Sequence, residues 1–437
     1  VLSMDTFQIL DAGYFGGSTT DGIDRVLRAN DGSIIITGNS ASTDLPVTPN
    51  AFQPRKRGNA NDWDAFIAIF DSTFQLTYCS YHGGATGAGE DAWKGLAETE
   101  HYIAFAGTVL STDMPVTDDA YQKTFAGGYY DAYLCVVSKD GLKRVYSTYL
   151  GGSGVDDIME ILSVGDDKIV IIGSTDSPDF PVTINAWQPE FGDIPPRDHG
   201  DIFIGVFSLQ DGTFEQLTFF GGGAYDFAKS AFYDPVSDVV LIAGTTFSQD
   251  LPFLSPDTCA CFSRGVIVHY NPQTLLPGPS VSIADIGYNS LNDILRTKDG
   301  RLMYSGGTTR KSGYDPLPVK STGVKSTLTG SGDIFIGILR DTPVAVESLA
   351  EAIPGNGELT VYPQPVRDKL RFTFEGTQEG TAALFDLLGR KMCEVRLSGN
   401  GNAVRGDMRL RGVSPGIYML VVRTADTVRT GKVVVAR

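Results

Sequence analysis

The residues of this chain whose types and spacing could do chemistry are aspartates that recur along the sequence. One set lies in turns that contain a proline, and the other set begins an apolar stretch. The first set is Asp44, Asp113, Asp179, Asp250 and Asp315, and the second is Asp64, Asp131, Asp201 and Asp333. A ring of carboxylates could hold Ca²⁺ through its oxygen atoms. A turn aspartate also accepts backbone N–H bonds, which would repeat for structural reasons alone, and we favour this interpretation over a metal site.

Other groups that enzymes use are sparse. The four histidines, His82, His101, His199 and His269, show no metal-ligand spacing, so we expect structural imidazoles with satisfied hydrogen bonds. His199 follows Asp198, which could orient it as a base, but no activated Ser or Cys partner is recognisable. The sequence has no GxSxG elbow and no Walker loop. We therefore predict no catalytic, metal-binding or cofactor-binding residue, and a protein that is not an enzyme.

The recurring aspartates belong to a sequence repeat with a period of about 65 to 70 residues. An aromatic residue and a glycine pair mark each copy, and these glycines suit turns that need positive φ. The marked segments are 14–17, 81–84, 149–152 and 220–223, with a degraded fifth copy at 286–288. Between the marks, an apolar stretch such as Ile34–Gly38 ends in a small turn, and another such as Asp64–Phe70 begins at the aspartate. This pattern predicts about four short strands per unit and no helix.

The repeat predicts how the strands are arranged in space. A four-stranded sheet of this length cannot bury both faces alone, so the sheets should stack around an axis. We predict an all-β fold in which residues 1–340 form a five-bladed β-propeller. The fifth unit ends at Asp333–Leu339 without a last strand, whereas residues 7–17 parallel residues 74–84. The N-terminal strand, residues 6–15, should therefore pair with the fifth sheet, which would close the ring and remove two exposed edges.

The repeat unit resembles the SBBP repeats of bacterial surface proteins. The matching pieces are Tyr146–Gly152 (YSTYLGG), Ile172–Thr183 (IGSTDSPDFPVT) and Asp64–Ile67 (DAFI). The resemblance spans roughly residues 7 to 340, and it is clearest in the first three units. It implies a propeller in a secreted or surface-located protein, and it implies no shared reaction.

The sequence changes character after Leu339. Residues 341–358 contain Pro and Gly and should form a linker. Residues 359–437 alternate apolar and polar residues, with apolar stretches at 369–374, 382–392 and 416–422, as a small antiparallel β-sandwich domain would.

The C-terminal domain resembles the sorting domain of proteins exported by the bacterial type IX secretion system. The residues that carry the resemblance are Tyr362, Pro363, Pro365, Asp386, Gly389, Arg390, Gly416, Tyr418 and Lys432. Gln364 departs from the Asn usual in this turn, and Gln is less suited than Asn to an Asx-type turn. The resemblance implies the type IX secretion machinery as a partner, and export through the outer membrane to the cell surface or medium of a Bacteroidetes-like bacterium. The chain begins at Val1 rather than Met, which suggests that a signal peptide was removed or left out.

Composition excludes several classes of function. The formal net charge of −17 opposes binding to nucleic acid, and no apolar run approaches the roughly 20 residues of a membrane-spanning helix. The five cysteines are too few and too scattered for a disulfide framework; a bridge between Cys259 and Cys261 would close a strained ring and is not favoured.

Charge also separates the two domains. From residue 342 onward there are 13 Lys or Arg against 10 Asp or Glu, and before it 22 against 42. A weakly basic domain tethered to an acidic propeller could dock on another copy, giving head-to-tail self-assembly into a filament. Our leading prediction is thus a structural or adhesive surface protein. The alternatives are a propeller that binds a glycan or peptide, with Trp63, Trp93 and Trp187 as candidate stacking platforms, and a hydrolase or lyase acting on polysaccharides.

Overall fold

A computed structural model describes residues 12–437 with gaps. The residues left out are 1–11, 60–61, 87–90, 193–199, 236, 253–262, 279, 284–286, 298–300, 311–331, 340–359, 363–368, 376–379, 386–390, 398–402, 411–412, 414–415, 425–427 and 436–437. Several predictions fall outside the described residues. They concern most of the N-terminal closing strand, His199, the Cys259 and Cys261 pair, Asp315, the 341–358 linker, and Pro363, Pro365, Asp386, Gly389 and Arg390 of the sorting-domain motifs.

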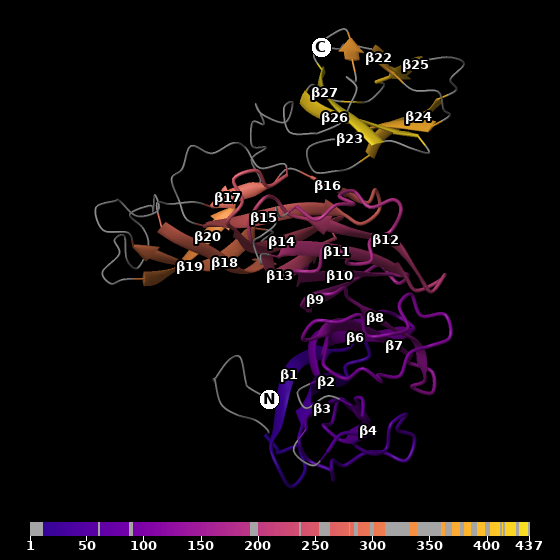
Figure 1. Ribbon diagram of the computed structural model, residues 1–437, viewed down its shortest axis with the longest axis vertical. Coiled ribbons are helices and arrows are strands. Elements are labelled where there is room, and N and C mark those ends of the chain that lie inside the picture. The colour runs from indigo at the N-terminus through magenta and orange to yellow at the C-terminus, as the bar shows by residue number, and fades with distance from the viewer. Residues whose placement is uncertain are drawn as a thin grey trace. The chain divides into compact units, whose positions relative to one another are not determined.

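The described part of the chain is all-β, as predicted, and contains antiparallel sheets that are not closed into a barrel (Figure 1). Three four-stranded sheets follow one another along the sequence, each with a simple neighbour-to-neighbour order. The first contains β1 (Asp21–Arg28), β2 (Ile34–Ser40), β3 (Asp64–Phe70) and β4 (Leu76–His82). The second contains β5 (Ala92–Glu98), β6 (Tyr102–Val109), β7 (Asp131–Ser138) and β8 (Arg144–Leu150). The third contains β9 (Asp156–Val164), β10 (Lys168–Thr175), β11 (Asp201–Ser208) and β12 (Thr213–Phe220).

The fourth and fifth sheets depart from this pattern. In the fourth, β13 (Asp226–Asp234), β14 (Val239–Thr246) and β15 (Arg264–Asn271) are followed by two short strands that both pair with β15, β16 (Leu276–Pro277) and β17 (Val281–Ile283). The fifth has only β18 (Gly287–Arg296), β19 (Leu302–Arg310) and β20 (Gly332–Leu339), in that order. The fifth sheet therefore lacks a fourth strand among the described residues, and β20 lies at its edge.

The glycines that end the apolar stretches lie within strands and not in the predicted turns. We predicted a small turn at Gly38, but this residue lies inside β2, opposite a β-bulge between Ile23 and Arg25 of β1. A Cβ atom on Gly38 would lie 2.0 Å from the carbonyl oxygen of Gly22, and Gly107 stands in the same relation to Ala92 at 1.7 Å. The bulge brings the neighbouring backbone too close for any side chain, so glycine is required there.

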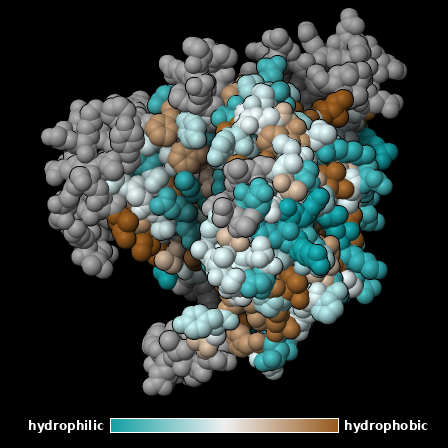
Figure 2. Space-filling model, turned by 60° about the horizontal axis from the view of Figure 1, so that its bottom comes forward, coloured by the Kyte–Doolittle hydropathy of each residue, from teal (hydrophilic) through white to brown (hydrophobic). Residues whose placement is uncertain are grey.

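The chain divides into two compact units. The first comprises residues 1–181 and 207–214, and the second comprises 182–206 and 215–437. The core of the first unit includes alternate residues of β3 together with Trp93, Leu96 and Phe105. Strand β7 is buried along almost its whole length, because both of its faces are covered. On the face shown in Figure 2, apolar side chains form small patches between hydrophilic ones.

Within the second unit, the C-terminal residues form two sheets, as predicted for a β-sandwich. One contains β21 (Thr360–Tyr362), β22 (Lys369–Glu375) and β25 (Ala403–Arg409), and the other has the order β24 (Lys391–Leu397), β23 (Gly380–Phe385), β26 (Gly416–Thr424) and β27 (Val428–Val435). Leu370, Phe372, Leu384, Leu420 and Val433 are among the buried residues between them. The apolar stretch predicted at 382–392 is instead two strands, β23 and the start of β24, which pair antiparallel. No helix in the described residues is long and apolar enough to cross a membrane.

Candidate functional site

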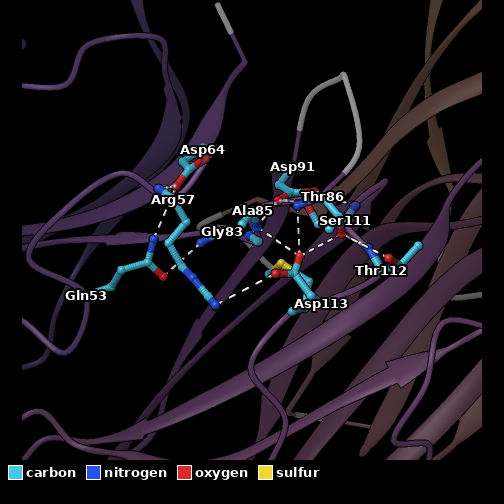
Figure 3. A network of polar contacts seen from close by, with 12 residues as sticks. Gln53, Arg57, Asp64, Gly83, Ala85, Thr86, Asp91, Ser111, Thr112 and Asp113 are labelled. Carbon is cyan, nitrogen blue, oxygen red and sulfur yellow. Dashed lines mark hydrogen bonds and ion pairs between the residues drawn. The ribbon is translucent and has the colours of Figure 1, made fainter. Parts of the chain in front are cut away.

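The best-defined polar site is the glycine turn that connects β4 to β5, shown in Figure 3. Asp91, which lies just before β5, accepts hydrogen bonds from the backbone N–H groups of Gly84 (3.1 Å), Leu110 (3.1 Å) and Ser111 (3.2 Å). The hydroxyl of Ser111 donates a fourth bond at 2.8 Å. Asp91 is only 2% exposed. One buried carboxylate thus joins the turn to the segment that follows β6.

A second aspartate holds the same turn from its exposed side. Asp113 accepts bonds from the N–H groups of Ala85 (2.8 Å) and Thr86 (3.0 Å), and from the hydroxyl of Thr86 (2.8 Å). The guanidinium of Arg57 lies 3.7 Å from the other oxygen of Asp113. Asp113 therefore does what the structural interpretation of the proline-adjacent aspartates expected, since its oxygen accepts backbone N–H bonds from a turn.

A third aspartate supports the start of the turn. The buried carboxylate of Asp64 accepts bonds from the N–H of Arg57 (2.9 Å) and from the side-chain amide of Gln53 (3.2 Å). The amide oxygen of Gln53 in turn accepts the N–H of Gly83 at 3.2 Å. Three carboxylates from separate parts of the repeat therefore converge on one short turn.

The arrangement recurs in the turns that precede the first, third and fourth sheets. In the first repeat, Asp21 and Asp44 accept the N–H groups of Gly17 (2.7 Å) and Ser18 (2.8 Å). In the later repeats, Gly152 and Ser153 donate to Asp156 and Asp179, and Gly222 and Gly223 donate to Asp226 and Asp250, all four at 2.8 Å. Likewise Gly151 and Gly221 donate to Gln122 (3.0 Å) and Gln188 (3.1 Å).

Four aspartates of this set, three of them buried, were not recognised from the sequence. Asp21, Asp91, Asp156 and Asp226 were not singled out, and neither was the repeated glutamine. A signal was present, because three of these aspartates follow the second glycine of the pair by four residues and Asp91 follows it by seven. Because this spacing varies between copies, the recurrence of these four aspartates was not recognised.

The reason for the glycine pairs differs from the predicted one. Among the described glycines with positive φ, only Gly16 belongs to one of the marked pairs, so positive φ is the wrong explanation for Gly83, Gly84, Gly151, Gly152, Gly221 and Gly222. A Cβ atom on Gly84 would lie 2.3 Å from Cβ of Ser111, and one on Gly221 would lie 2.1 Å from Oδ1 of Asp201. These glycines are needed because the carboxylates and serines approach the backbone closely.

Burial changes the proton affinity of the inner carboxylates. It raises the pKa of Asp64, Asp156 and Asp226 to about 6 and that of Asp131 to about 7, because the charged form loses its hydration. The outer carboxylates behave oppositely. Hydrogen bonds from Ser18 and Ser153 lower the pKa of Asp44 and Asp179. Within the described residues, no group of three or more His, Cys, Asp or Glu is arranged to hold a metal ion.

His82 departs from the expected satisfied imidazole. It is fully buried, and neither ring nitrogen has a hydrogen-bond partner. Its ring centroid lies 5.2 to 5.7 Å from those of Trp93, Phe52, Phe105 and Tyr133. Burial lowers the pKa of His82 well below its usual value, so the ring is neutral. Trp93 is also fully buried in this cluster, which rules it out as a stacking platform for a sugar.

The described residues of the sorting-domain motifs fall on strands. Tyr362 ends β21, Gly416 begins β26 and Lys432 lies in β27. Tyr418 is 7% exposed and belongs to the core between the two C-terminal sheets. Its role in the motif is therefore at least in part that of a core residue.

Comparison with known proteins identifies the C-terminal part of the chain. Residues 360–436 match the family described as "Secretion system C-terminal sorting domain". This is a type IX sorting domain, as predicted from Tyr362, Gly416, Tyr418 and the other motif residues. It indicates export through the outer membrane to the cell surface or extracellular space, and interaction with the type IX secretion machinery. No curated protein matches the chain.

Solved structures resemble the chain only distantly. An acylaminoacyl peptidase from Pyrococcus horikoshii is 10% identical with a TM-score of 0.35, over 94% of this chain and 52% of the peptidase. An ACO/RPE65 chimera is 11% identical with a TM-score of 0.34, over 70% of this chain and 63% of the chimera. Latent PorU from Porphyromonas gingivalis is 9% identical with a TM-score of 0.16, over 95% of this chain and 34% of PorU. The chain thus spans about half the length of the peptidase, and less than two thirds of the chimera.

Proposed function

We propose that the chain is an exported, non-enzymatic protein of the cell surface or medium, with a structural or adhesive repeat region. The observation that carries the proposal is the sorting domain at residues 360–436, because it fixes the route of export. The geometry of the repeated carboxylates supports the non-enzymatic part. Asp91 and Asp113 are occupied with backbone donors of their own turn, and Asp21, Asp44, Asp156 and Asp179 are occupied in the same way.

We further propose that the five sheets are the blades of one SBBP-type propeller closed by the N-terminal strand. In the first unit, Ala65, Ile67 and Ile69 share a core cluster with Trp93 of the next sheet. Ile334, Ile336 and Ile338 stand at the same steps after Asp333, yet they are 86%, 66% and 44% exposed. On β1, Ile23 and Val26 are 55% and 65% exposed.

These two apolar faces support ring closure, because the rest of the repeat buries the equivalent faces between sheets. Among the described residues no strand pairs with the outer edge of β20, which is where the N-terminal strand would bind. Class averages of the full chain by electron microscopy test the proposal. Five sectors around an axis are the expected result, and an open arc would contradict it.

Export and activity can be tested in a bacterium that has the type IX system. We expect the full chain on the surface or in the medium, and we expect a chain lacking residues 359–437 to remain in the periplasm. Mass spectrometry of the exported chain would show whether these residues are retained. Equal surface display without them would refute the assigned export route, and turnover of any substrate in a polysaccharide panel would refute the non-enzymatic assignment.

A glycan-binding propeller is the second candidate. The supporting observation is an aromatic pair with one exposed member: Tyr129 is 68% exposed, and its ring centroid lies 5.5 Å from that of the half-buried Tyr130. Such a pair can stack on a sugar ring. A glycan array with the full chain and with Tyr129→Ala tests this candidate, since binding that depends on Tyr129 would favour it and no binding would exclude the glycans sampled.

A further inference from the structure

The sorting domain has a second apolar face besides the one in its core. In β23 and β26, Leu384, Leu420 and Val422 point into the space between the two C-terminal sheets. Side chains alternate along a strand, so their neighbours Ala383, Phe385 and Val421 point to the opposite face. These three residues are only 7%, 5% and 2% exposed. We call them the outer face of the sorting sheet.

The outer face is covered by the repeat region of the same unit. Ala383, Phe385 and Val421 form one apolar cluster with Leu276 of β16, and Trp187 packs against it. Leu276 is 7% exposed. A small sandwich exported alone would need only its inner face to be apolar, so an apolar outer face indicates a docking surface.

The acceptor side is a local departure from the repeat. The last strands β4, β8 and β12 have seven or eight residues, whereas β16 has two. Leu276 lies on this shortened strand, at the outer edge of the fourth sheet. Trp187 stands beside Gln188 where the other repeats have Phe52 and Tyr121, and its ring centroid lies 5.9 Å from that of Phe220. We call Trp187 and Leu276 the acceptor site.

We propose that the sorting domain is exchanged between copies, so that the outer face of one copy binds the acceptor site of the next. This inference rests on the proposed structural role of the exported chain and on the head-to-tail self-assembly predicted from the charge of its two domains, and it names the two surfaces that associate. The contact within one copy shows that the outer face and the acceptor site fit each other. A domain swap uses the same contacts between copies as within one copy, so it needs no new complementarity.

Charge complementarity and a tether supply what exchange with a second copy needs. The acidic repeat region and the weakly basic C-terminal residues attract each other between copies as well as within one. The Pro- and Gly-containing linker at 341–358 is a suitable tether for exchange. The outer face and the acceptor site are different surfaces, so an assembly of any length has one unoccupied outer face at one end and one unoccupied acceptor site at the other. The contact is therefore heterologous, and it propagates head-to-tail unless a ring closes.

Two single variants of the full chain test the exchange. Trp187→Ala removes the acceptor and keeps the outer face, whereas Val421→Asp blocks the outer face and keeps the acceptor. Ile184→Ala is the matched control, because Ile184 belongs to the same unit and is fully exposed. Light scattering after size exclusion, over a wide range of concentrations, measures the assemblies, and circular dichroism confirms that each variant is folded.

We expect the wild type and Ile184→Ala to form assemblies that grow with concentration. Each of the other variants alone should remain monomeric over the same range, because the substitution removes the contact both within one copy and between copies. Mixed together, Trp187→Ala and Val421→Asp should form dimers and nothing larger, because only one productive contact exists. A wild type that is monomeric at every concentration would overturn the inference, and so would variants that assemble as the wild type does.

Export is measured separately on the same variants. We expect Trp187→Ala to be displayed as well as the wild type, since the residues of the sorting domain are unchanged. Normal display with lost assembly supports the exchange. Normal display with unchanged assembly would refute the exchange and leave the proposed function intact. Failed display of the wild type would refute the proposed function.

Discussion

The buried carboxylate of Asp91 offers the most direct test of the glycine-turn site. Asp91→Ala removes the acceptor of three backbone N–H groups and one hydroxyl. Gly84 and Ser111 are buried, so their N–H groups cannot turn to water, whereas Leu110 is half-buried. The substitution therefore leaves two buried N–H donors without a partner, in addition to the hydroxyl of Ser111.

The expected loss follows from those two donors. An unsatisfied buried donor costs about 1–3 kcal/mol, which gives about 2–6 kcal/mol for Gly84 and Ser111 together. Part of this is offset, because burial raises the pKa of Asp91 and alanine removes the cost of burying that charge. We therefore expect the free energy of unfolding to fall by about 2–4 kcal/mol.

Urea unfolding followed by tryptophan fluorescence measures this loss, since the buried Trp93 lies two residues from Asp91. Asp113→Ala is the matched control, because the Asp113 side chain is 34% exposed and water can replace it. The control should cost less than about 1 kcal/mol. The reasoning is refuted if Asp91→Ala costs no more than Asp113→Ala.

Three further predictions concern buried titratable groups. Burial raises the pKa of Asp131 to about 7, so its contribution to stability is fully present below the pKa of the unfolded chain and is lost as pH rises through 7. The urea midpoint of the wild type should therefore fall from pH 5 to pH 8, and that of Asp131→Asn should fall less. Burial lowers the pKa of His82, so its contribution to stability is present above the pKa of the unfolded chain and is lost as pH falls. His82→Leu introduces the residue that stands at the equivalent position of the second sheet, Leu150, and should raise the free energy of unfolding more at pH 5 than at pH 8. Equal effects at the two pH values would contradict this. Burial raises the pKa of the Cys79 thiol to about 12 and also raises that of Cys135. Iodoacetamide should therefore label both cysteines in urea and neither in the native chain, as measured by mass spectrometry. Labelling of the native chain would contradict this and would show that these strands open.

The strands could be predicted where both of their faces are buried. The apolar stretch Asp64–Phe70 coincides with β3. The first strands of the sheets, such as β1 and β5, were not found. Each carries a β-bulge, as between Trp93 and Gly95, and the extra residue breaks the alternation that announces a strand. In the C-terminal domain, β26 is apolar on both faces rather than alternating, because its outer face is covered.

By itself, the sequence determined the repeat, the all-β fold and the export domain, because these depend on local periodicity and on short motifs. Only the tertiary structure decided that Asp91 meets Ser111 and Gly84, and that Trp187 packs against the cluster that contains Phe385. Periodicity reports that a side chain is buried, but it does not report which distant residue covers it. That choice depends on how whole sheets pack, and the chain separating Trp187 from Phe385 carries no local trace of it.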